Sequence, residues 1–83
     1  MIDVLYFAWL RERIGAPKER IETEAATVAD LIEELKARSE AHGLAFADST
    51  SVRAALDQDL VEDFSAPLAG VREVAFFPPM TGG

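Results

Sequence analysis

Residues 1–8 alternate in the manner of a β-strand, in which successive side chains point to opposite faces of a sheet. The face that is predicted to point inward holds Ile2, Val4, Tyr6 and Ala8. Asp3 marks the other face as outward, because carboxylates are rarely buried. That outward face nevertheless also holds Leu5 and Phe7. The pattern predicts a strand with an apolar core face and a partly apolar outer face.

Residues 73–77 repeat this arrangement near the other end of the chain. Val74 and Phe76 share one face, and Phe77 shares the other face with Glu73. Since Glu73 marks the outward face, the alternation predicts that Phe76 lies in the core and Phe77 on the surface.

The clearest helical pattern follows Thr27, whose hydroxyl can accept a hydrogen bond from the first turn as an N-cap. Apolar residues at helical spacing define one face of this helix, and they are Val28, Leu31, Ile32 and Leu35. Gly43 is predicted to end the helix, because glycine is common just after a helix C-terminus. His42 is interpreted as part of that helix end and not as a catalytic group.

Shorter elements complete the pattern: a helical turn, a charged edge strand, a second helical turn, a third strand and a brief returning strand. They are predicted at residues 10–14, 18–23, 44–46, 52–56 and 60–61. The second helical turn is expected to place Leu44 or Phe46 on the core. Asp57 suits the turn before the returning strand, because Asp tolerates left-handed backbone conformations.

These elements predict an α+β roll, because a helix with one apolar face needs one sheet face to cover it. The roll would consist of a mixed sheet of about five strands around one main helix. The predicted core consists of Ile2, Val4, Tyr6, Ile21, Val28, Leu31, Ile32, Leu35, Val52, Leu56, Val74 and Phe76.

Composition limits the function further. The 83 residues suffice for one small domain, but not for a core together with a deep catalytic cleft. With no cysteine and one histidine, no disulfide framework and no metal site are expected. The net charge of −7 argues against nucleic acid and is compatible with a basic protein partner. No signal peptide or transmembrane run is visible, so a cytoplasmic protein without a membrane partner is expected.

The C-terminal residues after Phe77 do not continue the strand pattern. Pro78-Pro79 remove two backbone donors and must end the last strand. We therefore divide the chain into a domain at residues 1–77 and a C-terminal arm at residues 78–83. The arm ends in Gly82-Gly83, whose backbone can enter a channel too narrow for other residues. Its reactive group would be the terminal carboxylate; the simpler alternative is a frayed tail without a role.

Several stretches form a pattern that covers nearly the whole chain. The most specific stretch is Glu73-Val74-Ala75-Phe76-Phe77-Pro78-Pro79, followed by the terminal glycines. Weaker ones are Val4-Leu5-Tyr6-Phe7-Ala8 with Leu10-Arg11-Glu12, Thr27-Val28-Ala29-Asp30-Leu31, Ala55-Leu56-Asp57-Gln58-Asp59-Leu60-Val61 and Pro67-Leu68. In these stretches the chain resembles the small subunits of molybdopterin synthase, which are ubiquitin-like sulfur-carrier proteins. It departs from that family at Asp57, where Asn is usual, and at Gly70-Val71-Arg72, where an acidic turn is usual.

The resemblance implies a β-grasp, ubiquitin-like fold, with the first and last strands as parallel neighbours at the centre of the sheet. The apolar residues that this arrangement brings together on the outer face are Leu5, Phe7, Leu60 and Phe77. An exposed apolar cluster of this kind suggests a protein interface. The alternative is that residues 44–46 or Trp9 fold over this face and bury it.

The resemblance also implies a chemistry for the arm. A partner enzyme that uses ATP and Mg²⁺ would adenylate Gly83, and a sulfur donor would convert it to a thiocarboxylate. The thiocarboxylate would donate its sulfur to cyclic pyranopterin monophosphate in the large synthase subunit, during molybdenum cofactor biosynthesis. The arm residues that would guide Gly83 into this subunit are Pro78, Pro79, Met80, Thr81 and Gly82. The chain would be the sulfur-donating small subunit of a heterotetramer, with no bound cofactor and no complete active site of its own.

Other functions stay open. The chain could carry sulfur for thiazole or another product, modify proteins through isopeptide bonds to lysine, or act as a plain binding module. The pair Gly82-Gly83 is common to carriers and modifiers, whereas Phe7 and the Phe-Phe-Pro-Pro approach favour the synthase carrier.

Overall fold

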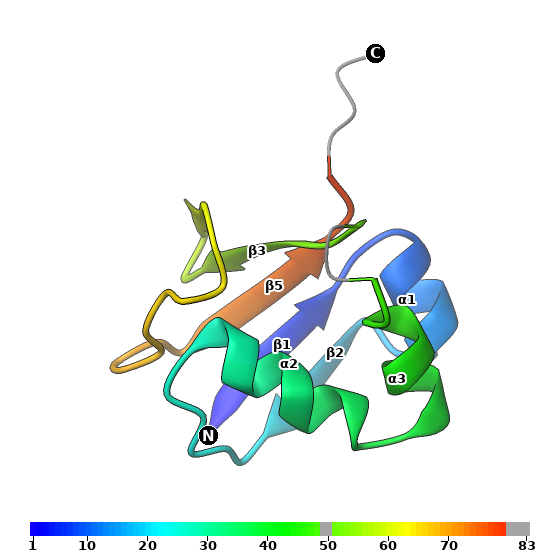
Figure 1. Cartoon of the computed structure of the whole chain (residues 1–83), viewed down its shortest axis with the longest axis horizontal. Helices are drawn as coiled ribbons and strands as arrows, with labels where there is room; N and C mark the ends of the chain where they lie inside the picture. The colour runs from blue at the N-terminus through cyan, green and yellow to red at the C-terminus, as the bar shows by residue number, and fades with distance from the viewer. Residues whose placement is uncertain (49–50, 80–83) are drawn as a thin grey trace.

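The computed structural model describes residues 1–48 and 51–79. They form a five-stranded mixed sheet in the order β2-β1-β5-β3-β4, with α2 and α3 packed against one face (Figure 1). In chain order the elements are β1 (Ile2–Tyr6), α1 (Trp9–Ile14), β2 (Lys18–Ile21), α2 (Val28–Lys36), α3 (Glu40–Ala45), β3 (Arg53–Leu56), β4 (Asp59–Val61) and β5 (Glu73–Phe77). The predicted α+β roll is confirmed.

The strands β1 and β5 are parallel neighbours at the centre of the sheet, as predicted. Their register pairs Tyr6 with Phe76, so both strands end at the same edge. β3 lies antiparallel on the other side of β5 and places Arg53 opposite Phe77. The chain leaves β5 at this edge, where Pro78 and Pro79 begin the arm (Figure 1).

The core fills the space between the inner sheet face and the helices. Thr27 caps α2 as predicted, because its hydroxyl accepts a hydrogen bond from the backbone N–H of Asp30 at 3.2 Å. Every residue of the predicted core is buried. Of the two candidates after α2, Phe46 enters the core and packs edge-on against Phe76 at 5.0 Å, whereas Leu44 stays exposed. The other residues of the buried core cluster that the sequence pattern did not place there are Leu10, Ala45, Ala54 and Leu68. Ala55 is buried as well, but it lies outside this cluster.

The predicted end of the main helix is wrong. α2 ends at Lys36, and the second helix α3 contains both His42 and Gly43. Ser39 starts α3, because its hydroxyl accepts a hydrogen bond from the backbone N–H of His42 at 3.1 Å as an N-cap. A Cβ atom on Gly43 would lie 3.3 Å from the carbonyl oxygen of Lys36. Gly43 therefore allows α3 to pack closely against the end of α2 and does not end a helix.

Three strands are shorter than predicted, and the smallest difference is in β3, which begins at Arg53 and not at Val52. β1 ends at Tyr6, because Ala8 has a left-handed φ of 55° and turns the chain toward α1. β2 ends at Ile21, and the hydroxyl of Thr23 accepts a hydrogen bond from the backbone N–H of Ala25 at 3.0 Å in the following loop.

The turn between β3 and β4 forms where it was expected. Asp57 and Gln58 have left-handed φ values of 49° and 75°. Asp57 Oδ1 also accepts hydrogen bonds from the backbone N–H groups of Arg72 at 3.0 Å and Glu73 at 2.9 Å. Asp57 thus holds the entry to β5, next to the segment where the sequence departs from the family pattern.

Candidate protein-binding face and C-terminal arm

The outer face of the sheet carries an apolar row that crosses its strands. The register places Leu5 of β1 beside Ala75 of β5, Ala75 beside Ala55 of β3, and Ala55 beside Leu60 of β4. Leu60 is 66% exposed. Strand alternation indicated that Ala55 and Ala75 point outward, but their small side chains kept them out of the predicted interface. In the structure they lie between Leu5 and Leu60, with Ala75 partly exposed and Ala55 only 9% exposed.

Two phenylalanines extend this row toward the edge from which the arm leaves. Phe7 is 45% exposed, and its backbone N–H donates to the carbonyl oxygen of Phe76 at 3.0 Å, which keeps Phe7 beside β5. Phe77 ends β5 and lies partly exposed opposite Arg53. We call the combined surface the outer apolar face, and it consists of Leu5, Phe7, Ala55, Leu60, Ala75 and Phe77.

The segments that were considered as covers for this face pack elsewhere. The ring of Phe46 lies 6.3 Å from that of Tyr6 and 5.0 Å from that of Phe76, and both of these residues point to the inner face. Trp9 packs beside the core cluster. Within residues 1–48 and 51–79, the outer apolar face is thus open to a partner. An exposed apolar face of this kind is a candidate protein interaction site.

Charged groups border the outer apolar face at the end away from the arm. Asp3 forms ion pairs with Arg20 at 2.9 Å and with Lys18 at 3.7 Å, both on β2. The hydrogen bond from Arg20 lowers the pKa of Asp3, so this carboxylate is ionised at neutral pH. A polar rim beside an apolar centre is typical of protein interfaces.

The arm begins next to the outer apolar face. The chain leaves the end of β5 directly into Pro78 and Pro79 (Figure 1). Both prolines are partly exposed. Neither has a backbone N–H, so the sheet cannot continue along them. The other arm residues with a predicted role lie outside the described residues, and they are Met80, Thr81, Gly82 and Gly83. A partner that receives the arm would therefore also meet Phe7 and Phe77.

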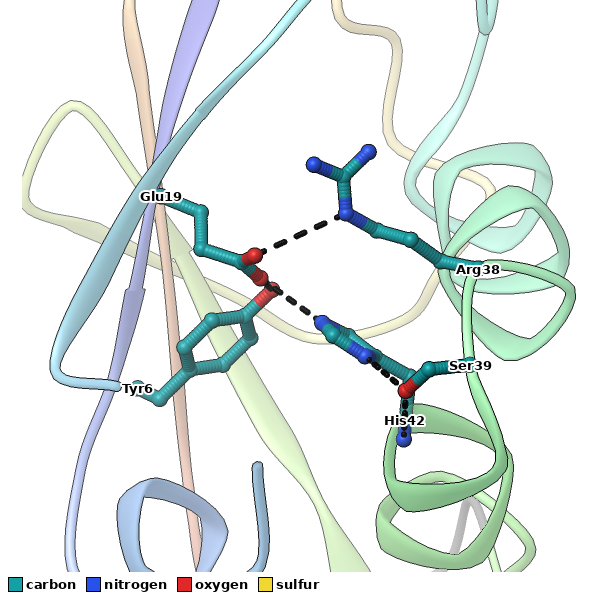
Figure 2. A network of polar contacts seen from close by, with 5 residues as sticks. All are labelled: Tyr6, Glu19, Arg38, Ser39 and His42. Atoms are coloured by element: carbon teal, nitrogen blue, oxygen red, sulfur yellow. Dashed lines mark hydrogen bonds and ion pairs between the residues drawn. The ribbon is translucent and has the colours of Figure 1, made fainter. Parts of the chain in front are cut away.

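A polar cluster between the sheet and α3 is a second candidate site (Figure 2). Glu19 Oε1 accepts a hydrogen bond from the Tyr6 hydroxyl at 2.7 Å and lies 2.7 Å from His42 Nε2. Glu19 Oε2 lies 3.5 Å from Arg38 Nε. On the other side of the imidazole, Ser39 Oγ lies 2.7 Å from His42 Nδ1. The order of serine, histidine and carboxylate is that of a hydrolytic triad, but here the Ser39 hydroxyl also caps α3.

We call the five residues of Figure 2 the polar clamp, because their electrostatics favour a structural role. Burial disfavours the charge of Glu19, but hydrogen bonds from His42 and Tyr6 outweigh it and lower the pKa of Glu19. Burial and the bond to Glu19 raise the pKa of Tyr6 far above its usual value, so Tyr6 stays a donor. No buried side-chain N or O atom of the described residues lacks a partner. We conclude that the cluster ties β1 and β2 to α3, and that His42 is structural.

In the described part of the chain, no group of His, Cys, Asp or Glu side chains is arranged to hold a metal ion. No helix there is long and apolar enough to span a membrane.

The model of the ThiS family matches residues 4–83 of this sequence. The chain belongs to the ThiS family. Two curated relatives align with the chain over all 83 residues, and each alignment covers 100% of this chain and 100% of the relative. The molybdopterin synthase sulfur carrier subunit of Escherichia coli (strain K12) is 42% identical. The protein of the same name from Haemophilus influenzae (strain ATCC 51907 / DSM 11121 / KW20 / Rd) is 37% identical.

Solved structures agree with this family assignment. A putative molybdopterin converting factor, subunit 1, from Pyrococcus furiosus has a TM-score of 0.71 and 32% identity, covering 95% of this chain and 97% of that one. SAMP1 from Haloferax volcanii also has a TM-score of 0.71, at 24% identity, covering 99% of this chain and 98% of that one. Together with the ThiS family match, these structures confirm the predicted β-grasp fold.

Proposed function

We propose that this chain is the sulfur carrier subunit of a molybdopterin synthase. The observation that carries the proposal is the full-length similarity to two proteins of that name, at 42% and 37% identity. The outer apolar face at the base of the arm supports it. A carrier has to hold a partner and present its C-terminus to that partner at the same time.

In the proposed complex, the large synthase subunit covers the outer apolar face. Phe7, Leu60 and Phe77 are the proposed anchors, because a few large apolar residues usually supply most of the binding energy of an interface. The arm then runs past Pro78 and Pro79 into the active site of the large subunit. Assembly into a heterotetramer is part of this proposal.

The proposed chemistry takes place at the carboxylate of Gly83. A carboxylate is a poor electrophile, so an activating enzyme joins it to the AMP part of ATP with Mg²⁺ and releases pyrophosphate. Sulfur from a donor displaces AMP and leaves a C-terminal thiocarboxylate. The sulfur of this thiocarboxylate attacks an electrophilic carbon of the cyclic pyranopterin substrate, forms a C–S bond and displaces an oxygen substituent from that carbon. Water then cleaves the resulting thioester, which leaves the sulfur on the substrate and restores the carboxylate.

In this scheme the chain has two tasks, which are to bind the large subunit and to direct Gly83 into the active site of that subunit. We propose that the chain binds no cofactor of its own, that its partners supply ATP, Mg²⁺ and the sulfur donor, and that it acts in the cytoplasm. Pro78 and Pro79 help to direct the arm, because the ring of each proline restricts φ and stiffens the base of the arm.

Mass spectrometry of the intact chain tests the proposal. After incubation with the activating enzyme, ATP, Mg²⁺ and a sulfur donor, we expect a mass increase equal to the exchange of one oxygen for sulfur. Addition of the large subunit and its pterin substrate should return the original mass and form molybdopterin. A chain that never acquires sulfur would contradict the proposal, and an adduct between Gly83 and a protein lysine would indicate a modifier instead.

A further inference from the structure

A shallow hollow lies between α1 and α3, at the end of the sheet from which the arm leaves. Its volume is about 320 Å³, and Trp9, Arg13, Leu44 and Ser51 are among its lining residues. Ser51 closely precedes Arg53, which pairs with Phe77 at the end of β5. The hollow and the outer apolar face are thus on different sides of the base of the arm.

The floor of the hollow is apolar and aromatic. Leu44 is 63% exposed on α3, although it is a large aliphatic residue. Trp9 is partly exposed on α1, and the Arg13 guanidinium lies over its ring at 5.3 Å from the centroid. This stacking holds Arg13 in place at the rim, because a cation is attracted to the face of an aromatic ring.

The hollow is lined by one basic residue, Arg13, and one acidic residue, Asp48. The net charge is −7. Nevertheless, within residues 1–48 and 51–79 no ion pair joins Arg13, or the nearby Arg11 and Arg53, to a carboxylate. Asp48, on the other side of the hollow, is held by a hydrogen bond from the Ser51 hydroxyl at 3.0 Å. Arg13 is therefore placed to bind a carboxylate from outside the chain.

We propose that the hollow is a second docking site for the large synthase subunit, an inference that rests on the proposed function. Its occupant is a segment of that subunit which places an apolar side chain on Trp9 and Leu44 and a carboxylate on Arg13. The site lies close to the outer apolar face along the chain, because only Ala8 separates Phe7 on that face from Trp9 in the hollow. A partner that encloses the base of the arm reaches both sides of it.

Contacts on two sides of the arm determine its direction better than one contact. A partner that bound only the outer apolar face could rotate relative to that face, and this rotation would displace the end of the arm. The second contact, at the hollow, restricts this rotation. The predicted result is an arm that enters the large subunit along one path.

Calorimetric titration of the full chain with the large subunit tests the hollow. Leu44→Asp should weaken binding at least about tenfold, because it places a carboxylate on an apolar contact. Arg13→Gln should weaken binding by about three- to tenfold and should reduce its dependence on salt, because it removes one exposed charge pair. The matched controls are Ala69→Asp and Arg72→Gln, which change the charge equally at exposed sites away from the arm. Both controls should bind like the parent.

Fluorine NMR gives an independent readout. Trp9 is the single tryptophan of the sequence, so a chain grown with 5-fluorotryptophan has one resonance. Saturation with the large subunit should shift this resonance, and should shift it less in Leu44→Asp. If Leu44→Asp and Arg13→Gln both bind like the parent while Phe77→Ala binds weakly, the second site is wrong and the proposed function stands. If the parent chain itself does not bind, both proposals are wrong.

Discussion

Phe76 and Phe77 are adjacent and equally hydrophobic, and strand alternation alone gives them different roles. Phe76 is fully buried and packs against Phe46, whereas Phe77 lies on the outer apolar face. A difference of one position in a strand therefore decides whether an aromatic ring stabilises the fold or is available to a partner.

We predict opposite effects for the two alanine variants. Phe76→Ala should lower the free energy of unfolding by about 3–5 kcal/mol, because it leaves a cavity in the core. Phe77→Ala should leave the free chain nearly as stable as the parent and weaken binding to the large subunit by about 2 kcal/mol. Urea unfolding and calorimetric titration measure the two effects. Phe7→Ala should behave like Phe77→Ala, and a reversal of the pair would show that the register is shifted by one residue.

Glu19 makes an acid-sensitive contribution to stability. Hydrogen bonds in the clamp lower its pKa in the folded state, so the folded chain favours the ionised form. The contribution is complete above the unfolded pKa of about 4.3 and is lost as the pH falls through the lower folded pKa. Glu19→Gln should therefore be less stable than the parent near neutral pH, and this difference should shrink in acid.

Urea unfolding of both chains between about pH 7 and pH 3 measures that difference, over a range that spans the usual pKa of Glu. The control is Glu62→Gln, which removes an exposed carboxylate outside the clamp. A gap between Glu19→Gln and the parent that stayed constant down to the lowest pH would exclude Glu19 ionisation as its cause.

At the scale of elements, the two-helix arrangement after β2 depends on Ser39. The periodic apolar pattern ends with α2, and the Ser39 cap starts α3 in a new direction. α3 then carries Phe46 to the core and His42 to Glu19. One hydroxyl thus helps to organise both the apolar packing and the polar clamp on this side of the sheet.

Ser39→Ala should lower the free energy of unfolding by about 1–2 kcal/mol, since loss of an N-cap has a cost in this range. Ser39→Asp is the matched variant, because an Asp carboxylate also caps helices and can accept from the backbone N–H of His42. Urea midpoints of the three chains should place Ser39→Asp closer to the parent than Ser39→Ala. Equal losses in both variants would mean that the cap does not matter for α3.

At the scale of the whole molecule, the folded domain and its arm have separate tasks. The parallel pair β1 and β5 at the centre of the sheet puts the end of β5 beside Phe7. The outer apolar face and the base of the arm therefore share one end of a rigid sheet. The position of the arm relative to a docked partner follows from this arrangement.

Deletion of Gly83 should abolish sulfur transfer and leave the thermal unfolding midpoint nearly unchanged. The physical reason is that the terminal carboxylate is the proposed reactive group, whereas the core is formed by residues 1–77. Molybdopterin formation in vitro and thermal melting measure the two properties. Thr81→Ser, which keeps the length of the arm, should retain transfer. An active Gly83 deletion would contradict the carrier function.

Short-range physical rules were enough to predict much of this structure from the sequence. Alternation separated Val74 and Phe76 from Phe77, because the two faces of a strand meet different surroundings. Thr27 and the apolar face of α2 identified the main helix by a cap and a period, which depend on neighbouring residues only. The parallel pairing of the first and last strands followed from the family resemblance and not from these patterns.

Local sequence patterns were sufficient to predict the strands, the start of α2, the core and the diproline exit, because short-range sterics and alternation specify each of them. Four features became visible only in the folded chain: the separation of α2 from α3, the pairing of Glu19 with His42, the row from Leu5 to Leu60, and the hollow at Trp9. Each of these depends on side chains that are distant in the sequence and meet only when the sheet and helices pack together.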